Sequence, residues 1–213
     1  MPNLLRKKFS YSFNHVTLII AAVNALVFIM TGSGRNPNFQ YLLGLQPILF
    51  VRGHYFWQLL TYMFMHGSWS HLLSNMLGLI FFGIYVERQV GSKEFLFFYL
   101  LCGILCGAAS LGIYAAVGYW QILLVGASGA VYAVLLLFAV IFPRSTVFIL
   151  GLVPVPAPLL IAIYAGIAIF DQVFGMNQGV AHLTHLSGFA AAWLICIVRY
   201  GANPIKVWKD AFR

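Results

Sequence analysis

Six apolar stretches suitable for spanning a membrane constrain this chain more than any other feature of its sequence. They lie near residues 16–31, 70–86, 95–117, 124–142, 157–174 and 179–198. A spanning helix needs about 20 predominantly apolar residues plus a connection, so a chain of 213 residues has room for six. Only 8% of the residues are charged, against roughly 25% in soluble domains. The sequence predicts an all-α membrane protein with six transmembrane helices and excludes soluble enzymes, disordered chains and disulfide-stapled secreted modules.

The distribution of basic residues predicts the orientation of these spans. Only Arg35 and Arg52 fall on one side of the predicted membrane. The residues at the opposite ends of the spans are Arg6, Lys7, Lys8, Arg88, Lys93, Arg144, Arg199, Lys206, Lys209 and Arg213. Because an excess of Lys and Arg marks the cytoplasmic side, both termini are predicted to be cytoplasmic. The basic residues behind the net charge of +8 are thus expected to set the topology and to contact anionic lipid headgroups. No nucleic-acid partner is predicted.

The same reasoning divides the chain into three parts. Residues 1–15 are predicted to form a cytoplasmic N-terminal segment, residues 16–199 the six-helix membrane domain and residues 200–213 a cytoplasmic tail. The expected location is the inner (plasma) membrane of a bacterium. The three cysteines, Cys102, Cys106 and Cys196, lie in apolar runs and are interpreted as small core residues. No metal or cofactor is predicted.

Four polar residues inside the spans are candidates for function, because an unpaired polar group in hydrocarbon costs several kcal/mol. They are His71 and Asn75 in the second span, Ser128 in the fourth and His185 in the sixth. Counting inward from the basic ends at about 1.5 Å per residue puts all four roughly 6–12 Å below the outer surface. Three helices thus supply polar groups at one depth, which predicts a single site.

Ser128 is the candidate nucleophile within Gly126-Ala127-Ser128-Gly129. The flanking glycines would let backbone approach a substrate carbonyl, and a serine at the start of a helix can offer its own N–H to an oxyanion. Such a group of small residues is also typical of tight packing between membrane helices. In this interpretation Gly126 and Gly129 support the site.

His185 is the candidate general base, because it lies at the depth of Ser128 and is followed by the small residues Gly188 and Ala192. These small residues would let the sixth span pack closely on the fourth. The alternative is a hydrogen-bonded core histidine. His182 lies one turn closer to the outer surface and competes for the same role.

His71 and Asn75 lie four residues apart, so both side chains project from one helix face. Two N–H donors directed at one point suit a tetrahedral oxyanion, although they could instead hold helices together. Tyr132, one turn after Ser128, is expected to pack against the His185 ring. The acidic residues lie near span ends, so a Ser–His dyad is predicted rather than a triad, and Glu87 with Arg88 is interpreted as a loop-capping ion pair.

Three motifs resemble those of the rhomboid family of intramembrane serine proteases. They are His66-Gly-Ser-Trp-Ser-His71-Leu-Leu-Ser-Asn75, Gly126-Ala-Ser128-Gly129-Ala-Val-Tyr132-Ala and Ala181-His-Leu-Thr-His185-Leu-Ser-Gly188. The match extends over about residues 50–195, with the motifs in the family's order. It implies a six-helix bundle with a Ser128–His185 dyad, oxyanion donors at His71, Asn75 and the Ser128 N–H, and His66 in a supporting position. One departure is Gln58, because the family often has Trp-Arg where this chain has Trp57-Gln58.

The predicted function is therefore cleavage of single-span membrane proteins within the lipid bilayer, through an acyl-enzyme. An inactive rhomboid-like binding or quality-control protein and a haem or metal protein using His66, His71, His182 and His185 remain alternatives. Phe174, near the outer end of the fifth span, is a candidate lateral gate for substrate, with the loop at 175–179 above the site. The ordinary alternative for Phe174 is a lipid-facing or core aromatic residue.

Overall fold

The structure, a computed structural model, describes residues 8–149, 151–174 and 181–213, and the side chains of residues 171–174, 181 and 182 are outside this description. The six apolar stretches fall on its longer helices. These are α1 (Val16–Met30), α5 (Trp69–Val90), α6 (Ser92–Ala116), α7 (Ser128–Ile141), α8 (Ala157–Phe174) and α9 (Ala181–Val198). The shorter elements are α2 (Pro37–Leu43), α3 (Pro47–Arg52), α4 (Gln58–Thr61), η2 (Tyr62–Phe64), β1 (Thr146–Ile149), β2 (Val153–Pro156) and α10 (Pro204–Ala211).

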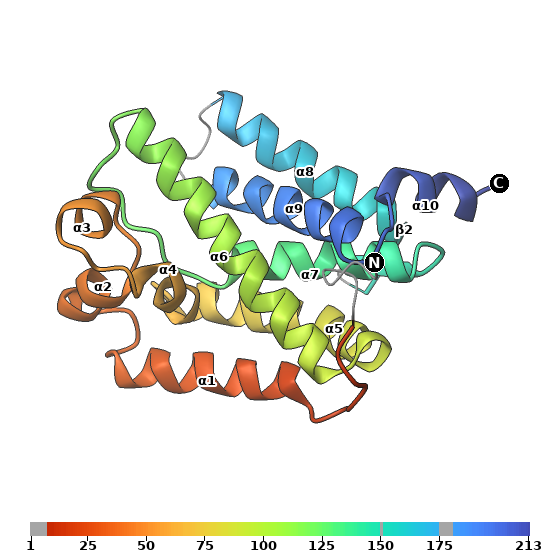
Figure 1. Ribbon diagram of the computed structural model, residues 1–213, viewed down its shortest axis with the longest axis horizontal. Helices are drawn as coiled ribbons and strands as arrows, with labels where there is room; N and C mark the ends of the chain where they lie inside the picture. The colour runs from red at the N-terminus through yellow and green to blue at the C-terminus, as the bar shows by residue number, and fades with distance from the viewer. Residues whose placement is uncertain (1–7, 150, 175–180) are drawn as a thin grey trace, which may run out of the picture.

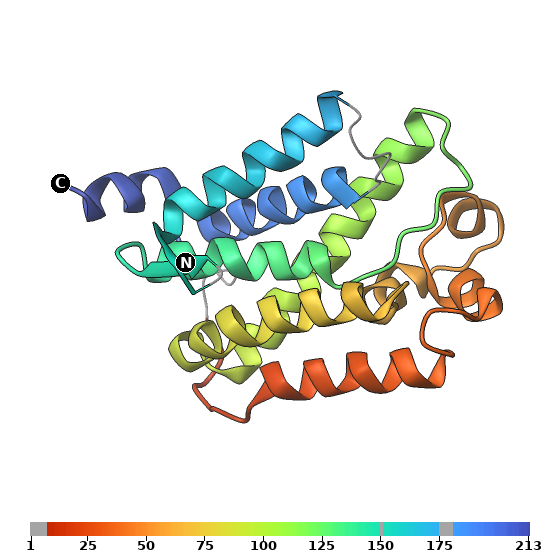
Figure 2. The same ribbon diagram turned by 180° about the vertical axis from the view of Figure 1, so that it is seen from behind.

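The longer helices form a bundle with α7 in its middle. Helices α5, α6 and α9 surround α7, while α1 and α8 lie at opposite edges (Figures 1 and 2). Helix α7 is accordingly buried along nearly all of its length, and its apolar side chains form the centre of the core. A residue at the start of α7 therefore lies inside the protein.

Two of the described helices, α5 and α6, are long and apolar enough to cross a membrane. Helices α1 and α7 and the stretches Ala157–Phe170 and Leu183–Val198 are apolar but shorter. The fold is thus mostly helical, as expected, with apolar helices at the six expected places. The number of membrane crossings and the side on which the termini lie stay predictions.

Backbone pairing shapes the chain at both ends of α7. The apolar stretch at 124–142 is helical only from Ser128, as expected for a serine at the start of a helix. Leu124 exchanges two backbone hydrogen bonds of 2.9 Å with Leu45, and the Gly126 N–H donates to the Tyr62 carbonyl at 2.9 Å. At its other end, the proline-containing segment that connects α7 to α8 forms an antiparallel hairpin in which β1 pairs with β2. The predicted all-α fold class is therefore corrected in one respect, because the structure also contains a two-stranded sheet.

The close approach of α7 and α9 depends on a glycine. A Cβ at Gly188 of α9 would collide with the backbone carbonyl oxygen of Gly129 in α7. Ala192, one turn further along α9, is fully buried. The small residues expected on the sixth span thus do face the fourth, and they bring the first turns of the two helices together.

Glu87 does not form the expected ion pair with Arg88. Its buried carboxylate accepts hydrogen bonds from the N–H groups of Val16 and Thr17 at 2.7 and 2.8 Å, and from the hydroxyls of Thr17 and Ser92 at 2.7 and 2.5 Å. It therefore caps the N-terminus of α1, where helix N–H groups lack intrahelical partners. Arg88 is exposed and lies over the Phe13 ring.

Gln58, at the position where the family often has arginine, is completely buried under the segment that contains α2 and α3. Its Nε2 donates to the Tyr41 carbonyl at 2.9 Å, and its Oε1 accepts from the Gln46 N–H at 3.1 Å. A neutral amide can donate and accept at once, which an arginine cannot. Gln58 thus fixes this segment through both kinds of hydrogen bond.

Candidate active site

Ser128 is the first residue of α7 and lies half-buried near the centre of the bundle. Gly126, two residues earlier, has φ of 119°, a conformation that residues with a Cβ rarely adopt. This turn and the extended backbone before it end at Ser128, so the serine N–H belongs to the first turn of the helix, where N–H groups lack intrahelical acceptors. A hydroxyl and a free backbone donor are therefore available at one residue.

His185 lies on the first turns of α9, and the ring of Tyr132 holds its orientation. The two rings are stacked, with centroids 4.1 Å apart and planes inclined by 6°. Tyr132 follows Ser128 by one helical turn on α7, which puts the imidazole over the same stretch of that helix. The expected packing of Tyr132 against His185 is thus present. A stacked ring keeps few rotational alternatives, which suits a general base.

His71 and Asn75 approach the same region from α5. A Cβ at Gly126 would lie only 2.6 Å from Nε2 of His71, so the imidazole packs directly against the backbone that leads into Ser128. Nδ2 of Asn75 donates to the His71 carbonyl oxygen at 2.7 Å. Because the amide has two N–H groups, the second can serve another acceptor. Any side chain at Gly126 would displace His71.

A cavity of about 640 Å³ brings these side chains together. Its polar lining includes Ser128 from α7, His185 from α9 and both His71 and Asn75 from α5. The remaining lining residues are Tyr62, Ser74, Gly78, Phe82, Leu123, Leu124, Val125, Val131, Tyr132, Leu135, Tyr164 and Thr184. A volume of this size suits a peptide segment and falls within the range of small-molecule sites. Gly129 lies beneath, in contact with α9 rather than in the lining.

His66 lies behind His71 and is almost completely buried. The two imidazole rings meet edge to face with centroids 5.0 Å apart, and neither ring nitrogen of His66 has a hydrogen-bond partner among the described residues. Burial, together with the neighbouring His71, lowers the pKa of His66 from 6.5 to about 4. A neutral His66 therefore supports the His71 ring near pH 7 without adding a charge.

Several expected residues fall outside this description. They are the side chains of His182 and Phe174 and the loop at 175–179, so the second histidine and the gate stay predictions. None of the carboxylates whose side chains are described lines the cavity, and the side chain of Asp171 is outside the description, so the dyad stays a prediction. Among the described residues, no three His, Cys, Asp or Glu side chains are arranged to hold a metal ion.

Among the cavity residues that were not foreseen from the sequence, three carry polar groups near the site. Tyr62 comes from the segment between α4 and α5, Tyr164 from α8, and Thr184 immediately precedes His185. The Tyr164 ring meets Tyr132 edge to face at 5.7 Å, and the Thr184 carbonyl accepts a hydrogen bond from the Cys106 thiol at 3.0 Å. A polar residue in an apolar span was an available signal for Thr184, whereas tyrosines in such spans are too common to be informative.

Comparison with known proteins adds independent information on this site. A family model described as the rhomboid domain matches residues 53–201, which include all the polar cavity residues. RHOMBOID-like protein 4 of Arabidopsis thaliana is 34% identical over 161 residues, which are 75% of this chain and 38% of that protein. RHOMBOID-like protein 12, mitochondrial, of the same plant is 32% identical over 194 residues, covering 83% of this chain and 56% of that protein.

A bacterial relative matches over most of its length. Rhomboid protease GlpG of Haemophilus influenzae is 26% identical over 184 residues, covering 85% of this chain and 89% of that protein. The chain thus spans about half or less of the two plant relatives and nearly all of the bacterial one.

Proposed function

This chain belongs to the rhomboid family, whose members are integral membrane proteins, and on that premise we propose that it is an intramembrane serine endopeptidase. Its substrates are single-span membrane proteins, cut near the outer face of the bilayer. One observation carries the proposal: Ser128, at the start of a buried helix, lines the same cavity as a histidine held by ring stacking and two N–H donors from α5.

In the proposed reaction the Ser128 hydroxyl attacks the carbonyl carbon of the scissile peptide. His185 takes the hydroxyl proton and passes it to the leaving amine nitrogen, which breaks the C–N bond and leaves an acyl ester on Ser128. A water molecule, deprotonated by His185, then attacks this ester and regenerates the serine. His71, Asn75 and the Ser128 N–H would donate to the oxyanion that forms in both steps.

The proposal includes the membrane arrangement predicted from the sequence. Residues 16–199 would cross a bacterial inner (plasma) membrane six times, with residues 1–15 and 200–213 both cytoplasmic. The apolar character of the six longer helices and the basic residues at one end of the bundle support this arrangement. The side chains at residues 170 and 174 would then border the route from lipid to the cavity, with Phe174 as the gate.

A fluorophosphonate probe tests for an activated serine without knowledge of the substrate. We expect the purified protein in mild detergent to be labelled covalently at Ser128, because the probe reacts with a serine that a base can deprotonate. Mass spectrometry of the labelled peptide identifies the residue. An inactive rhomboid-like protein would give no labelling, and labelling of another serine would contradict the assignment.

The proposed oxyanion donors make a separate prediction. Removal of one such donor in a serine hydrolase costs about 2.7–4 kcal/mol, or about 10²–10³ in turnover. His71→Ala and Asn75→Ala should each lower turnover with a smaller change in KM, measured on a fluorogenic transmembrane substrate. Leu73→Ala, on the exposed side of α5 between them, is the matched control. A rise in KM with unchanged turnover would instead indicate that the pair binds substrate.

A further inference from the structure

We propose that the β1–β2 hairpin is a membrane anchor, whose apolar tip inserts into the lipid leaflet at the basic end of the bundle and holds the adjoining end of α8. This role is independent of peptide cleavage. It concerns residues 146–149 and 151–156, which lie between α7 and α8 and away from the cavity.

The tip of the hairpin is unusually apolar for an exposed turn. Leu152 is 80% exposed, Phe148 60% and Val153 56%. Burying a large apolar side chain is worth about 1.5–3 kcal/mol, so three such residues in water would be costly. An exposed apolar cluster of this kind marks a contact surface for another molecule or for a membrane.

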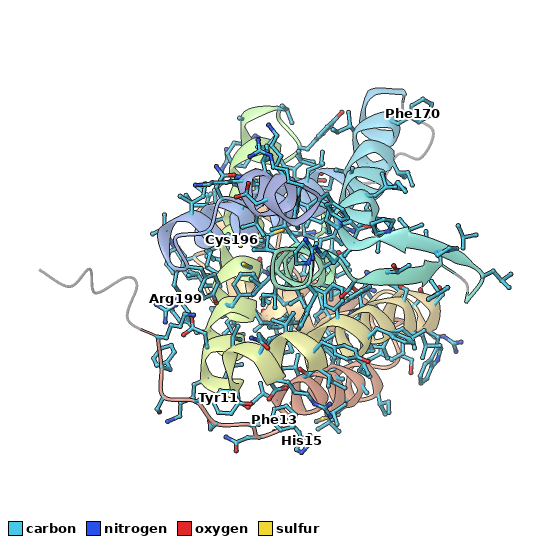
Figure 3. The ribbon with its side chains drawn as sticks, turned by 90° about the vertical axis from the view of Figure 1, so that its right-hand side faces the viewer. Tyr11, Phe13, His15, Phe170, Cys196 and Arg199 are labelled. Atoms are coloured by element: carbon cyan, nitrogen blue, oxygen red, sulfur yellow. The ribbon has the colours of Figure 1, made fainter. Side chains whose placement is uncertain are left out.

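The position of the hairpin indicates which of these contacts is made. Viewed from the end where α10 lies, the hairpin projects sideways from the bundle between α8 and α5 (Figure 3). Its tip therefore continues the apolar surface that these two helices present to their surroundings. The exposed apolar side chains of that surface include Leu73, Leu77, Phe81 and Tyr85 of α5 and Leu159, Ile163 and Ile167 of α8. Because family members are integral membrane proteins, lipid is the medium for which this surface is suited.

Basic residues at the same end give the hairpin its depth in the bilayer. Arg144 is exposed and lies two residues before β1, whereas Arg199 at the same end is paired with Glu94. Basic side chains suit the headgroup layer, particularly where its lipids are anionic. An apolar tip on a hairpin whose base carries an exposed arginine fits an interfacial anchor, which buries its apolar side chains about 5–10 Å into the boundary between headgroups and acyl chains.

The prolines of β2 argue against addition of a protein strand along β2. Pro154 is opposite Phe148 and Pro156 is opposite Thr146. Because proline has no N–H, the hydrogen-bonded pairs of this ladder are Val147 with Val155 and Ile149 with Val153. The two prolines then take the positions whose donors would face the free edge of β2. That edge has no N–H groups to offer, which is a known way of preventing strand addition.

The hairpin is coupled directly to the end of α8 that it adjoins. Strand β2 ends at Pro156 and α8 begins at the next residue, without a linker. The Ala157 N–H donates to the Ser145 carbonyl at 2.9 Å, which closes the base of the hairpin. Val155, Ala157 and Leu160 are buried there. An anchored hairpin would therefore fix this end of α8.

The depth of the tip can be measured with a fluorophore on a single cysteine. The native cysteines are all buried, so a bimane label should react selectively with Leu152→Cys in the full chain reconstituted into phosphatidylcholine vesicles. We expect brominated lipids to quench this label at least about twofold more strongly than the same label at the exposed Asp210→Cys on α10, because only the tip lies among acyl chains. Aqueous iodide should show the opposite preference. Leu77→Cys serves as the lipid-exposed reference.

Two results would overturn the insertion. One is iodide quenching at residue 152 as strong as at residue 210. The other is efficient cross-linking of Leu152→Cys protomers by a short bismaleimide in dilute vesicles, which would mean that the tip contacts a second copy.

The coupling to α8 has its own test. In vesicles, Phe148→Asp with Leu152→Asp should speed amide hydrogen exchange at Ala157 and at residues 159–161 by about tenfold, because that end of α8 loses its anchor. Ile205→Asp, on the exposed face of α10, is the matched control. Unchanged exchange would overturn the anchoring of α8.

Discussion

Replacing Ser128 with alanine is expected to lower cleavage of a transmembrane substrate by at least about 10⁴-fold, because loss of the nucleophile in a serine protease leaves only the contribution of the oxyanion hole and of binding. The substitution removes one hydroxyl at a half-buried position at the start of α7. Alanine leaves the backbone N–H in place, so packing and expression should be unaffected. The measurement is turnover of a single-span substrate in detergent or vesicles, with thermal unfolding followed in parallel.

Ser187→Ala is the matched control for this change. Ser187 lies on α9, two residues after His185, and its hydroxyl donates to the Leu183 carbonyl of its own helix at 2.9 Å. Removing it deletes a serine hydroxyl close to the site without touching the proposed chemistry, so activity should be retained. Full activity in Ser128→Ala would eliminate the proposed nucleophile.

His185→Ala should have an effect of similar size, because a serine hydroxyl is a weak nucleophile unless a base takes its proton. The loss should appear mainly in kcat, since the imidazole contributes to the transition state rather than to the docking of a substrate helix. Loss of the ring also removes the partner of Tyr132 in the stacked pair. Tyr132→Phe keeps the stacking surface and should retain most activity, because only the phenol hydroxyl is lost.

His182→Ala separates the two histidines of α9. If His185 is the base, the His182 variant keeps a substantial fraction of activity. A reversal of the two results would mean that the assignment of the base is wrong by one turn of α9.

The helices could be predicted from the sequence because long apolar runs in lipid leave the backbone few alternatives to a helix. The backbone pairing just before α7 could not, because residues 124–127 are as apolar as the helix that follows. Leu124 pairs with Leu45, which is 79 residues away along the chain. The hairpin was missed for a related reason: its prolines indicated only a break in the helix. Long-range pairing is not visible in local composition.

The candidate site could be predicted from the sequence as far as the depth of a residue in the membrane identifies its neighbours on other helices. Ser128, His185, His71 and Asn75 were grouped by residue counting, and all four line one cavity. Residue counting could not show which way each side chain faces. Tyr164 and Tyr62 reach the cavity from segments whose orientation depends on packing, and Glu87 bonds to α1 rather than to its neighbour Arg88.

The cap that Glu87 provides has a consequence for how the chain is made. Glu87 follows Val16 by 71 residues, so α1 leaves the ribosome well before its capping carboxylate exists. At about 5–20 residues per second, this delay is roughly 4–14 seconds. During that interval the first N–H groups of α1 have no partner in the protein. Helix α1 therefore receives its cap only after α5 has followed it, and the turn into α6 with Ser92 completes the joint.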